Sequence, residues 1–386
     1  MSTPRKHGIL PYQRIKALIA EGVIYAERPI DDRQIQPASL DLRLGTKAYR
    51  LISSFLPERP HAFEPQLNWL DMFRDLIMYE LDLTGGAILE KGHVYLIPLQ
   101  EQVRLPKHVR GRTNPKSSTG RLDIFTRVIT ELNVGFDDIR PGYHGPLYLE
   151  VVPRSFTIRV QPGLSLNQLR LISGRPQVSD TQLRRIHRTV PLLYTNSEPT
   201  VRNRPIASRE LRIDQGLFLR VDLQGDPGSP TPVIGYRAKK NSHVIDLSKI
   251  SYYSASDYWE AIPRQPDATL LLEPEEFYIL VSKERIQVPP EYAAEMVAYE
   301  AACGELRTHY AGFFDPGFGF GNRTRKGTQV VLEVRPHDVP FLIHDGQTFF
   351  KVLYEKMSAP PTHLYGSALG SSYYAQGLTL SKHFKW

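Results

Sequence analysis

One stretch of this chain occurs twice. Residues 88–106 read ILEKGHVYLIPLQEQVRLP, and residues 271–289 read LLEPEEFYILVSKERIQVP. The two stretches align without a gap at an offset of 183 residues, and the same offset pairs Glu150 with Glu333, inside YLEVVP and VLEVRP. Because two separate blocks share one offset, the chain is predicted to be an internal duplication. The repeated unit begins near Gln36 and again near Asp214.

The pattern within each repeat predicts β structure. Polar and apolar residues alternate over residues 39–44, 93–97 and 147–151, as in half-buried strands. The 31 prolines and 20 tyrosines favour short strands separated by turns. Residues 11–22 predict one short amphipathic helix, with Pro11 at its first position and Gly22 at its end.

We therefore expect a mainly β protein built from two tandem barrel or jelly-roll units. The first unit covers residues 1–174 and the second covers residues 214–386. Between them, residues 175–213 are rich in arginine, proline and serine, and they contain the run RRIHR at 184–188. Such a run is typical of a solvated linker or of an exposed helix face, and a phosphate-binding role is the alternative.

Charge and cysteine content narrow the choice of function. The net charge of +7 and the pI near 9.3 are compatible with nucleic acid, with a smaller polyanion such as a nucleoside triphosphate, or with a mildly basic surface. The single cysteine, Cys303, excludes an intramolecular disulfide and a cysteine-based zinc site. The basic N-terminus does not resemble a signal peptide, and no stretch approaches the roughly 18 apolar residues of a membrane span. We expect a soluble cytoplasmic protein.

The two repeats differ at one cluster of polar residues. The first repeat carries KSSTGR at 116–121, whereas the second repeat is eight residues shorter between its matching prolines. Small residues let backbone N–H groups approach a phosphate, while Lys116, Ser117, Ser118 and Arg121 could bind it with their side chains. The alternative is an ordinary turn that opens a short helix, with Ser117 or Ser118 as its N-cap.

Several motifs in order resemble the dCTP deaminases, which belong to the dUTPase-like β superfamily. QPASLDLRLG at 36–45 is followed by KSSTGRL, which resembles the family motif R-S-S-L-A-R-L. IRPGY at 139–143 and FDPGF at 314–318 both resemble I-D-P-G-W, and Glu150 and Glu333 occupy the glutamate of V-L-E. The resemblance runs through the first repeat and, without the serine–arginine segment, through the second.

The resemblance implies that Glu150 or Glu333 is the general base that activates water for attack on C4 of cytosine. Arg121 and Ser117 would hold the base and the water in place. It also implies dCTP as the substrate, Mg2+ as the companion of its triphosphate, and a homo-oligomer. Zinc deaminases instead need a histidine and two or three cysteines, so a zinc-free mechanism is expected here.

The departures from the family pattern suggest how the two repeats divide the work. The first repeat has Arg140 where the family has aspartate, and the second has Asp315 but no phosphate motif. Since active sites in this superfamily lie between subunits, we expect a composite site. The first repeat would contribute Lys116, Ser117, Ser118 and Arg121, and the second would contribute Ala311, Asp315 and Glu333. In the competing arrangement Glu150 is catalytic and the second repeat is structural.

The C-terminal tail also resembles the family. Tyr365 and Tyr373 are followed by Gln376, as in the family segment that folds over the nucleotide. A family lysine is replaced here by Ser372, and Lys382 is a possible substitute. A flexible tail is the alternative.

Two other functions remain open from the sequence. A dUTPase, or a bifunctional enzyme that converts dCTP to dUMP, shares the fold, but Arg140 replaces the aspartate that a dUTPase needs. A non-catalytic nucleotide sensor or nucleic-acid-binding protein would suit the basic charge. Because the sequence has no helix-turn-helix, zinc-finger or aromatic RNA-binding signature, nucleic acid is not the expected partner.

Overall fold

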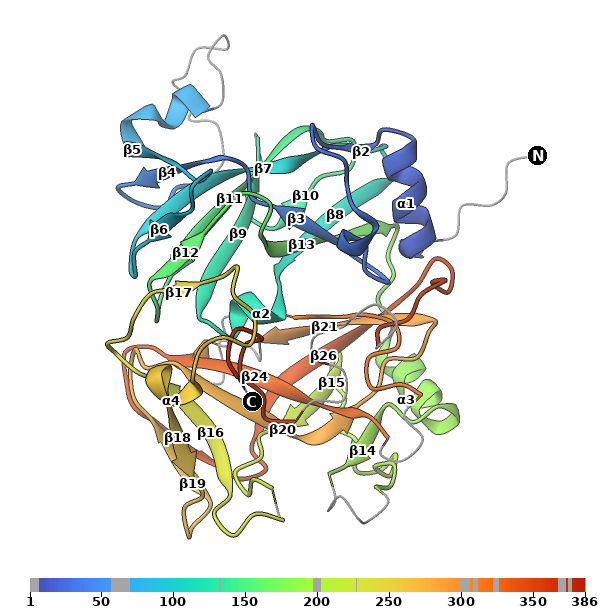
Figure 1. Cartoon of the computed structure of the whole chain (residues 1–386). Helices are drawn as coiled ribbons and strands as arrows, with labels where there is room; N and C mark the ends of the chain where they lie inside the picture. Colours follow the sequence, from blue (N-terminus) through green and yellow to red (C-terminus); the bar gives the residue numbers. More distant parts are fainter. Residues whose placement is uncertain are drawn as a thin grey trace, which may run out of the picture.

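The computed structural model describes residues 7–56, 70–131, 133–196, 203–226, 228–298, 306–307, 312–321, 326–366, 373 and 377–385. The chain is mainly β, as the alternation predicted. In Figure 1 the strands of the first repeat, in blue and green, lie above those of the second, in yellow to red. No helix in the described part of the chain is long and apolar enough to cross a membrane.

Two sheets form the body of the first repeat. One follows the order β1-β13-β8-β10, with β3 also on β13; its strands are β1 (Gly8–Ile9), β3 (Leu40–Arg43), β8 (Val109–Pro115), β10 (Asp138–Ile139) and β13 (Ser165–Ser173). The other follows the order β5-β4-β7-β11-β9, with β2 also on β7; its strands are β2 (Ile24–Tyr25), β4 (Lys47–Leu51), β5 (Ile77–Asp82), β7 (Val94–Arg104), β9 (Ile124–Thr130) and β11 (His144–Pro153). Two 3-10 helices accompany them, η1 (Asp32–Gln34) and η2 (Leu70–Leu76).

The second repeat has a matching pair of sheets. One follows the order β18-β16-β20-β24-β22, with β14 on β20; its strands are β14 (Leu193–Thr195), β16 (Val233–Ala238), β18 (Trp259–Pro263), β20 (Tyr278–Ile286), β22 (Leu306–Arg307) and β24 (Thr328–Pro336). The other follows the order β15-β26-β21-β23; its strands are β15 (Leu217–Arg220), β21 (Tyr292–Ala298), β23 (Phe313–Phe314) and β26 (Thr348–Lys356). A ribbon of β19 (Thr269–Leu272) and β25 (Phe341–His344) completes this half.

Strand registers reproduce the offset of the sequence repeat. Glu150 lies opposite Leu96, and Glu333 lies opposite Ile279, so both pairs differ by the same 183 residues. The ion pairs repeat as well. The Arg43 guanidinium donates to Glu101 at 2.6 Å, and Arg220 makes the equivalent bond to Glu284. The duplication is therefore present in backbone pairing and in side-chain contacts.

The N-terminal helix forms where the sequence predicted it, with one difference at its start. Helix α1 covers Tyr12–Ala20 and buries Ile15 and Leu18. Pro11 is the N-cap and not the first helical residue, because its backbone is extended. Gly22 follows the helix with φ of +69°, a conformation that glycine adopts without strain.

The arginine-rich segment after the first repeat is structured and not a free linker. It contains helix α3 (Asp180–Thr189), which Ser179 caps with its hydroxyl, and β14, which pairs with β20. Leu183 points into the apolar core of the second repeat, whereas the arginines at 184, 185 and 188 are exposed. Amphipathic spacing thus places the basic run on the solvent side of a packed helix. The predicted division at residues 174 and 214 stays a prediction.

Two segments of the second repeat cross over to the first. Strand β17 (Ile245–Asp246) pairs in parallel with β12 (Ile158–Val160), which also pairs with β6 (Ala87–Leu89). The chain end at 377–385 returns between the two halves, near α2 (Ser117–Gly120) in the centre of Figure 1. Phe384 is fully buried there, against Tyr258 and Trp259, next to the short helix α4 (Ala255–Tyr258). These crossings fix the interface that carries the candidate site.

Candidate active site

The polar cluster of the first repeat forms a tight helical turn. Helix α2 begins after Lys116, which is its N-cap and makes no side-chain cap bond. The alternative interpretation, a turn that opens a short helix, is correct about the helix, but its N-cap is Lys116 and both serines lie inside the turn. The Thr119 and Gly120 N–H groups donate to the Lys116 carbonyl at 2.8 and 3.0 Å. These two donors close the turn.

Glu333 of the second repeat lies directly against this turn. It projects from β24, and a Cβ added to Gly120 would overlap its carboxylate. Glu333 is 6% exposed. The structure therefore brings together the serine–arginine turn of one repeat and the glutamate of the other.

Burial dominates the electrostatics of this carboxylate. It raises the pKa of Glu333 to about 8; the guanidinium of Arg121 opposes the rise and the carboxylate of Asp123 adds to it. Arg121 is itself buried, and this lowers its pKa. Its guanidinium lies 3.8 Å from the centre of the Tyr373 ring and donates to the Thr379 carbonyl at 2.9 Å. The C-terminal tail thus holds Arg121 beside Glu333.

The equivalent glutamate of the first repeat has a different environment. Glu150 accepts from Arg127 Nε at 2.9 Å and from a terminal nitrogen of Arg127 at 2.5 Å. Its other oxygen accepts from the Ser54 hydroxyl at 2.7 Å. The Glu150 carboxylate is therefore held by an ion pair with Arg127 and by a hydrogen bond from Ser54.

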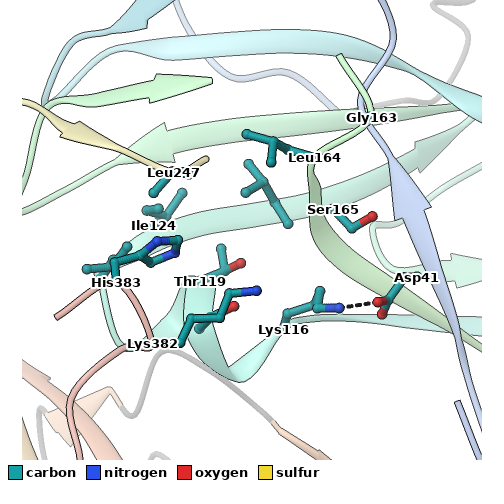
Figure 2. Close-up of a pocket in the computed structure, with 13 residues that line it drawn as sticks. Asp41, Lys116, Thr119, Ile124, Gly163, Leu164, Ser165, Leu247, Lys382 and His383 are labelled. Carbon is teal, nitrogen blue, oxygen red and sulfur yellow. Dashed lines mark hydrogen bonds and ion pairs between the residues drawn. The ribbon is translucent and has the colours of Figure 1, made fainter. Parts of the chain in front are cut away.

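A cavity of about 210 Å³ lies on the other side of α2. Lys116 and Lys382 reach into it from α2 and from the tail, as Figure 2 shows, and Lys116 forms an ion pair with Asp41. Burial and the charge of Lys116 lower the pKa of Lys382. Because Asp41 also lines the cavity and offsets the charge of Lys116, it is the ammonium group of Lys382 that favours an anionic occupant.

Of the remaining predicted residues, the structure describes Asp315 and Tyr365. Asp315 is buried in the turn after β23, where burial raises its pKa to about 6, and Arg170 donates to it at 3.4 Å. Tyr365 is half-buried, with its ring 5.5 Å from that of Phe318, and its N–H donates to the Pro316 carbonyl at 2.8 Å. The predicted Ala311 and Gln376 lie outside the described residues.

Sequence reasoning missed several charged residues near the site. Asp41 and Arg170 alternate with apolar residues in β3 and β13, so their sequence positions indicate a solvent-facing strand surface. In the structure Arg170 is fully buried, and Asp41 is 7% exposed. The burial of these two side chains becomes evident only from the three-dimensional packing of the chain. Among the residues that the structure describes, no three histidine, cysteine, aspartate or glutamate side chains cluster as a metal site.

A buried acid–base group beside a lysine-lined cavity defines an enzyme site for an anionic substrate. The comparisons with known proteins then specify the family. Residues 6–175 match the N-terminal domain of 2'-deoxycytidine 5'-triphosphate deaminase, and residues 179–384 match its C-terminal domain. The chain belongs to the dCTP deaminase family.

A crystal structure of 2'-deoxycytidine 5'-triphosphate deaminase from Agrobacterium tumefaciens is similar over nearly the whole chain. It is 43% identical, has a TM-score of 0.81, and the match covers 92% of this chain and all of that one. Two curated relatives are named "dCTP deaminase, dUMP-forming". The protein from Nanoarchaeum equitans is 30% identical over 45% of this chain and 87% of its own length. The protein from Streptomyces coelicolor is 31% identical over 42% of this chain and 78% of its own.

Proposed function

We propose that the chain hydrolyses dCTP to dUTP and ammonia at a composite site within one chain. Family membership over both halves, together with the similarity to a dCTP deaminase structure, supports the reaction. The contact between Glu333 and the 116–121 turn carries the assignment of the site. Glu150, by contrast, forms an ion pair with Arg127.

Glu333 acts as the general base in this proposal. Its carboxylate removes a proton from water as the oxygen adds to C4 of cytosine. It delivers this proton to the ring nitrogen, then takes the second proton from the new C4 hydroxyl and passes it to the amino group, so that the C4 carbonyl forms as the C4–N bond breaks and ammonia leaves. A group that both takes and gives protons works best with a pKa near the operating pH, and the pKa of about 8 meets this requirement.

Arg121 assists by position and by charge. Its guanidinium favours the ionised form of Glu333, and its stacking on Tyr373 fixes its direction. Ser117, at the start of the same turn, is half-buried and is proposed to orient the water or the base. Asp315 and Ala311 are proposed to line the base portion from the second repeat.

The cavity between α2 and the tail suits the triphosphate. Lys116 and Lys382 supply positive charge, and the side chains of Ser118 and Thr119 also line it. Magnesium would accompany the substrate and would offset part of the charge of its phosphates. Tyr365, Tyr373 and Gln376 belong to the tail that is proposed to close over the nucleotide. The family has a lysine at the position of Ser372, and Lys382 is proposed to take its role.

Three further features complete the proposal. Each repeat is proposed to be a dUTPase-like barrel or jelly roll, which its two sheets of antiparallel strands support. Catalysis is proposed to need no zinc, so a zinc chelator should leave the rate unchanged. The chain is proposed to act as a cytoplasmic homo-oligomer, and its mass in solution by light scattering tests this.

The proposed product can be tested directly. Ammonia and pyrophosphate are measured together from dCTP with magnesium, with CTP and dUTP as control substrates. Release of ammonia without pyrophosphate supports dUTP as the product. Equal release of both would show that the chain forms dUMP, as the names of the shorter relatives state for those proteins. Salt-dependent DNA binding with no release of ammonia would contradict an enzymatic role.

A further inference from the structure

A buried ion pair joins the two halves of the candidate site. Asp123 follows Arg121 by two residues in the first repeat, and Arg335 follows Glu333 by two residues in the second. The Arg335 guanidinium donates to the Asp123 carboxylate and to the Ser155 hydroxyl, the latter at 3.0 Å. Ser155 in turn donates to Asp123 at 2.6 Å. The side chain of Asp123 is fully buried, and that of Arg335 is 5% exposed.

Asp123 combines a left-handed backbone with a buried carboxylate. Its φ is +55°, a left-handed conformation that glycine adopts most easily. An aspartate at such a position carries a conformational penalty, and burial of its carboxylate carries another. A glycine would avoid both penalties but would remove the buried carboxylate that Arg335 contacts; the other carboxylate beside Arg335, that of Glu275 at 3.5 Å, is exposed.

We propose that Asp123 and Arg335 are a positioning pair that holds Glu333 of the second repeat in register with the Arg121 turn of the first. This inference rests on the composite site proposed above. Two residues along β24 lead from Arg335 to Glu333, and the turn after α2 leads from Asp123 to Arg121. Loss of this ion pair is expected to displace Glu333 relative to the Arg121 turn. Ground-state binding of the triphosphate is then spared, because Lys116 and Lys382 lie in the separate cavity.

The proposal predicts a specific kinetic signature. Arg335→Met should lower kcat about a hundredfold, the effect of a displacement of about 1 Å at the reacting centre, with little change in KM. Arg335→Lys should recover much of the loss, because it restores the charge. Asp123→Asn is close in shape and keeps hydrogen-bonding groups, so it guards against a variant that fails to fold.

The pH profile separates positioning from general stability. The charged and titratable groups that act on Glu333 among the described residues are Arg121, Asp123 and Tyr373. Because the Asp123 carboxylate raises the pKa of Glu333, Asp123→Asn should move the acidic limb of kcat/KM to lower pH. A general loss of stability would not move the acidic limb of kcat/KM.

The matched control is another ion pair between the two repeats. Arg159 of the first repeat lies 3.5 Å from Asp246 of the second, with side chains 47% and 17% exposed. Arg159→Gln should leave kcat, KM and the acidic limb of kcat/KM unchanged. If Asp123→Asn and Arg335→Met also match the wild type in kcat and in the pH limb, the positioning role is refuted. If Glu333→Gln is as active as the wild type, the composite site itself fails.

Discussion

Replacement of Glu333 by glutamine should stabilise the protein while it removes activity. The reason is that a buried carboxylate with a raised pKa opposes folding once it is ionised. The pKa of Glu333 rises from 4.5 to about 8 in the folded chain. Each pKa unit corresponds to about 1.4 kcal/mol, so the full effect is about 5 kcal/mol.

The sign follows from proton binding. Between pH 4.5 and about 8 the native state holds a proton on Glu333 that the unfolded state has released, so the free energy of unfolding falls as pH rises through this window. Glutamine carries no such proton. The stability gap between Glu333→Gln and the wild type should therefore open above pH 4.5 and level off above about 8.

Urea unfolding from pH 5 to 9, followed by tryptophan fluorescence, measures this gap. Glu150→Gln is the matched control, because it removes a carboxylate that Arg127 and Ser54 stabilise. The free energy of unfolding of Glu150→Gln should be lower than that of the wild type by about 1.5–3 kcal/mol, the range for a hydrogen bond to a charged group. A gap that is absent or independent of pH for Glu333→Gln would refute the reasoning.

Three other predictions concern the parts that surround Glu333. Arg121→Gln should move the acidic limb of kcat/KM to higher pH, because the guanidinium lowers the pKa of Glu333; an unmoved limb would contradict this coupling. Lys382→Gln should raise KM for Mg-dCTP about ten- to a hundredfold with little change in kcat, from the loss of a charge-assisted bond of about 1.5–3 kcal/mol; an unchanged KM would remove Lys382 from the triphosphate site. Phe384→Ala should release the tail, because a buried phenylalanine contributes about 3–5 kcal/mol. Hydrogen exchange at the Tyr252 and Lys385 amides, which bond across this contact, should then become faster, and equal rates would show that the tail is held elsewhere.

Local pattern predicted much of the fold. Alternation located β3, β7 and β11, and the 183-residue offset anticipated equivalent registers in the two repeats. These features follow from short-range periodicity and from repetition, which a single sequence displays directly. The proximity of Arg121 to Glu333 was expected from the way the two repeats divide the family motifs.

Contacts between distant segments could not be predicted in the same way. Nothing in the sequence shows that Arg127 lies beside Glu150, because this depends on the register between β9 and β11. The ion pair between Lys116 and Asp41 and the return of Phe384 to the first repeat likewise depend on packing. For the arginine run at 184–188 the pattern left a solvated linker and an exposed helix face open, because the side chains that pack against the core, Leu183, Ile186 and His187, are few in a polar stretch.

The assignment of catalysis to Glu333 is tested most directly by ammonia release from dCTP with the variants Glu333→Gln and Glu150→Gln, assayed with magnesium at pH 8. Loss of a general base lowers the rate by about 10²–10⁴, so Glu333→Gln should be nearly inactive. Glu150→Gln should keep the wild-type rate at a temperature where it stays folded. An active Glu333→Gln beside an inactive, folded Glu150→Gln would transfer catalysis to the first repeat and contradict the composite site.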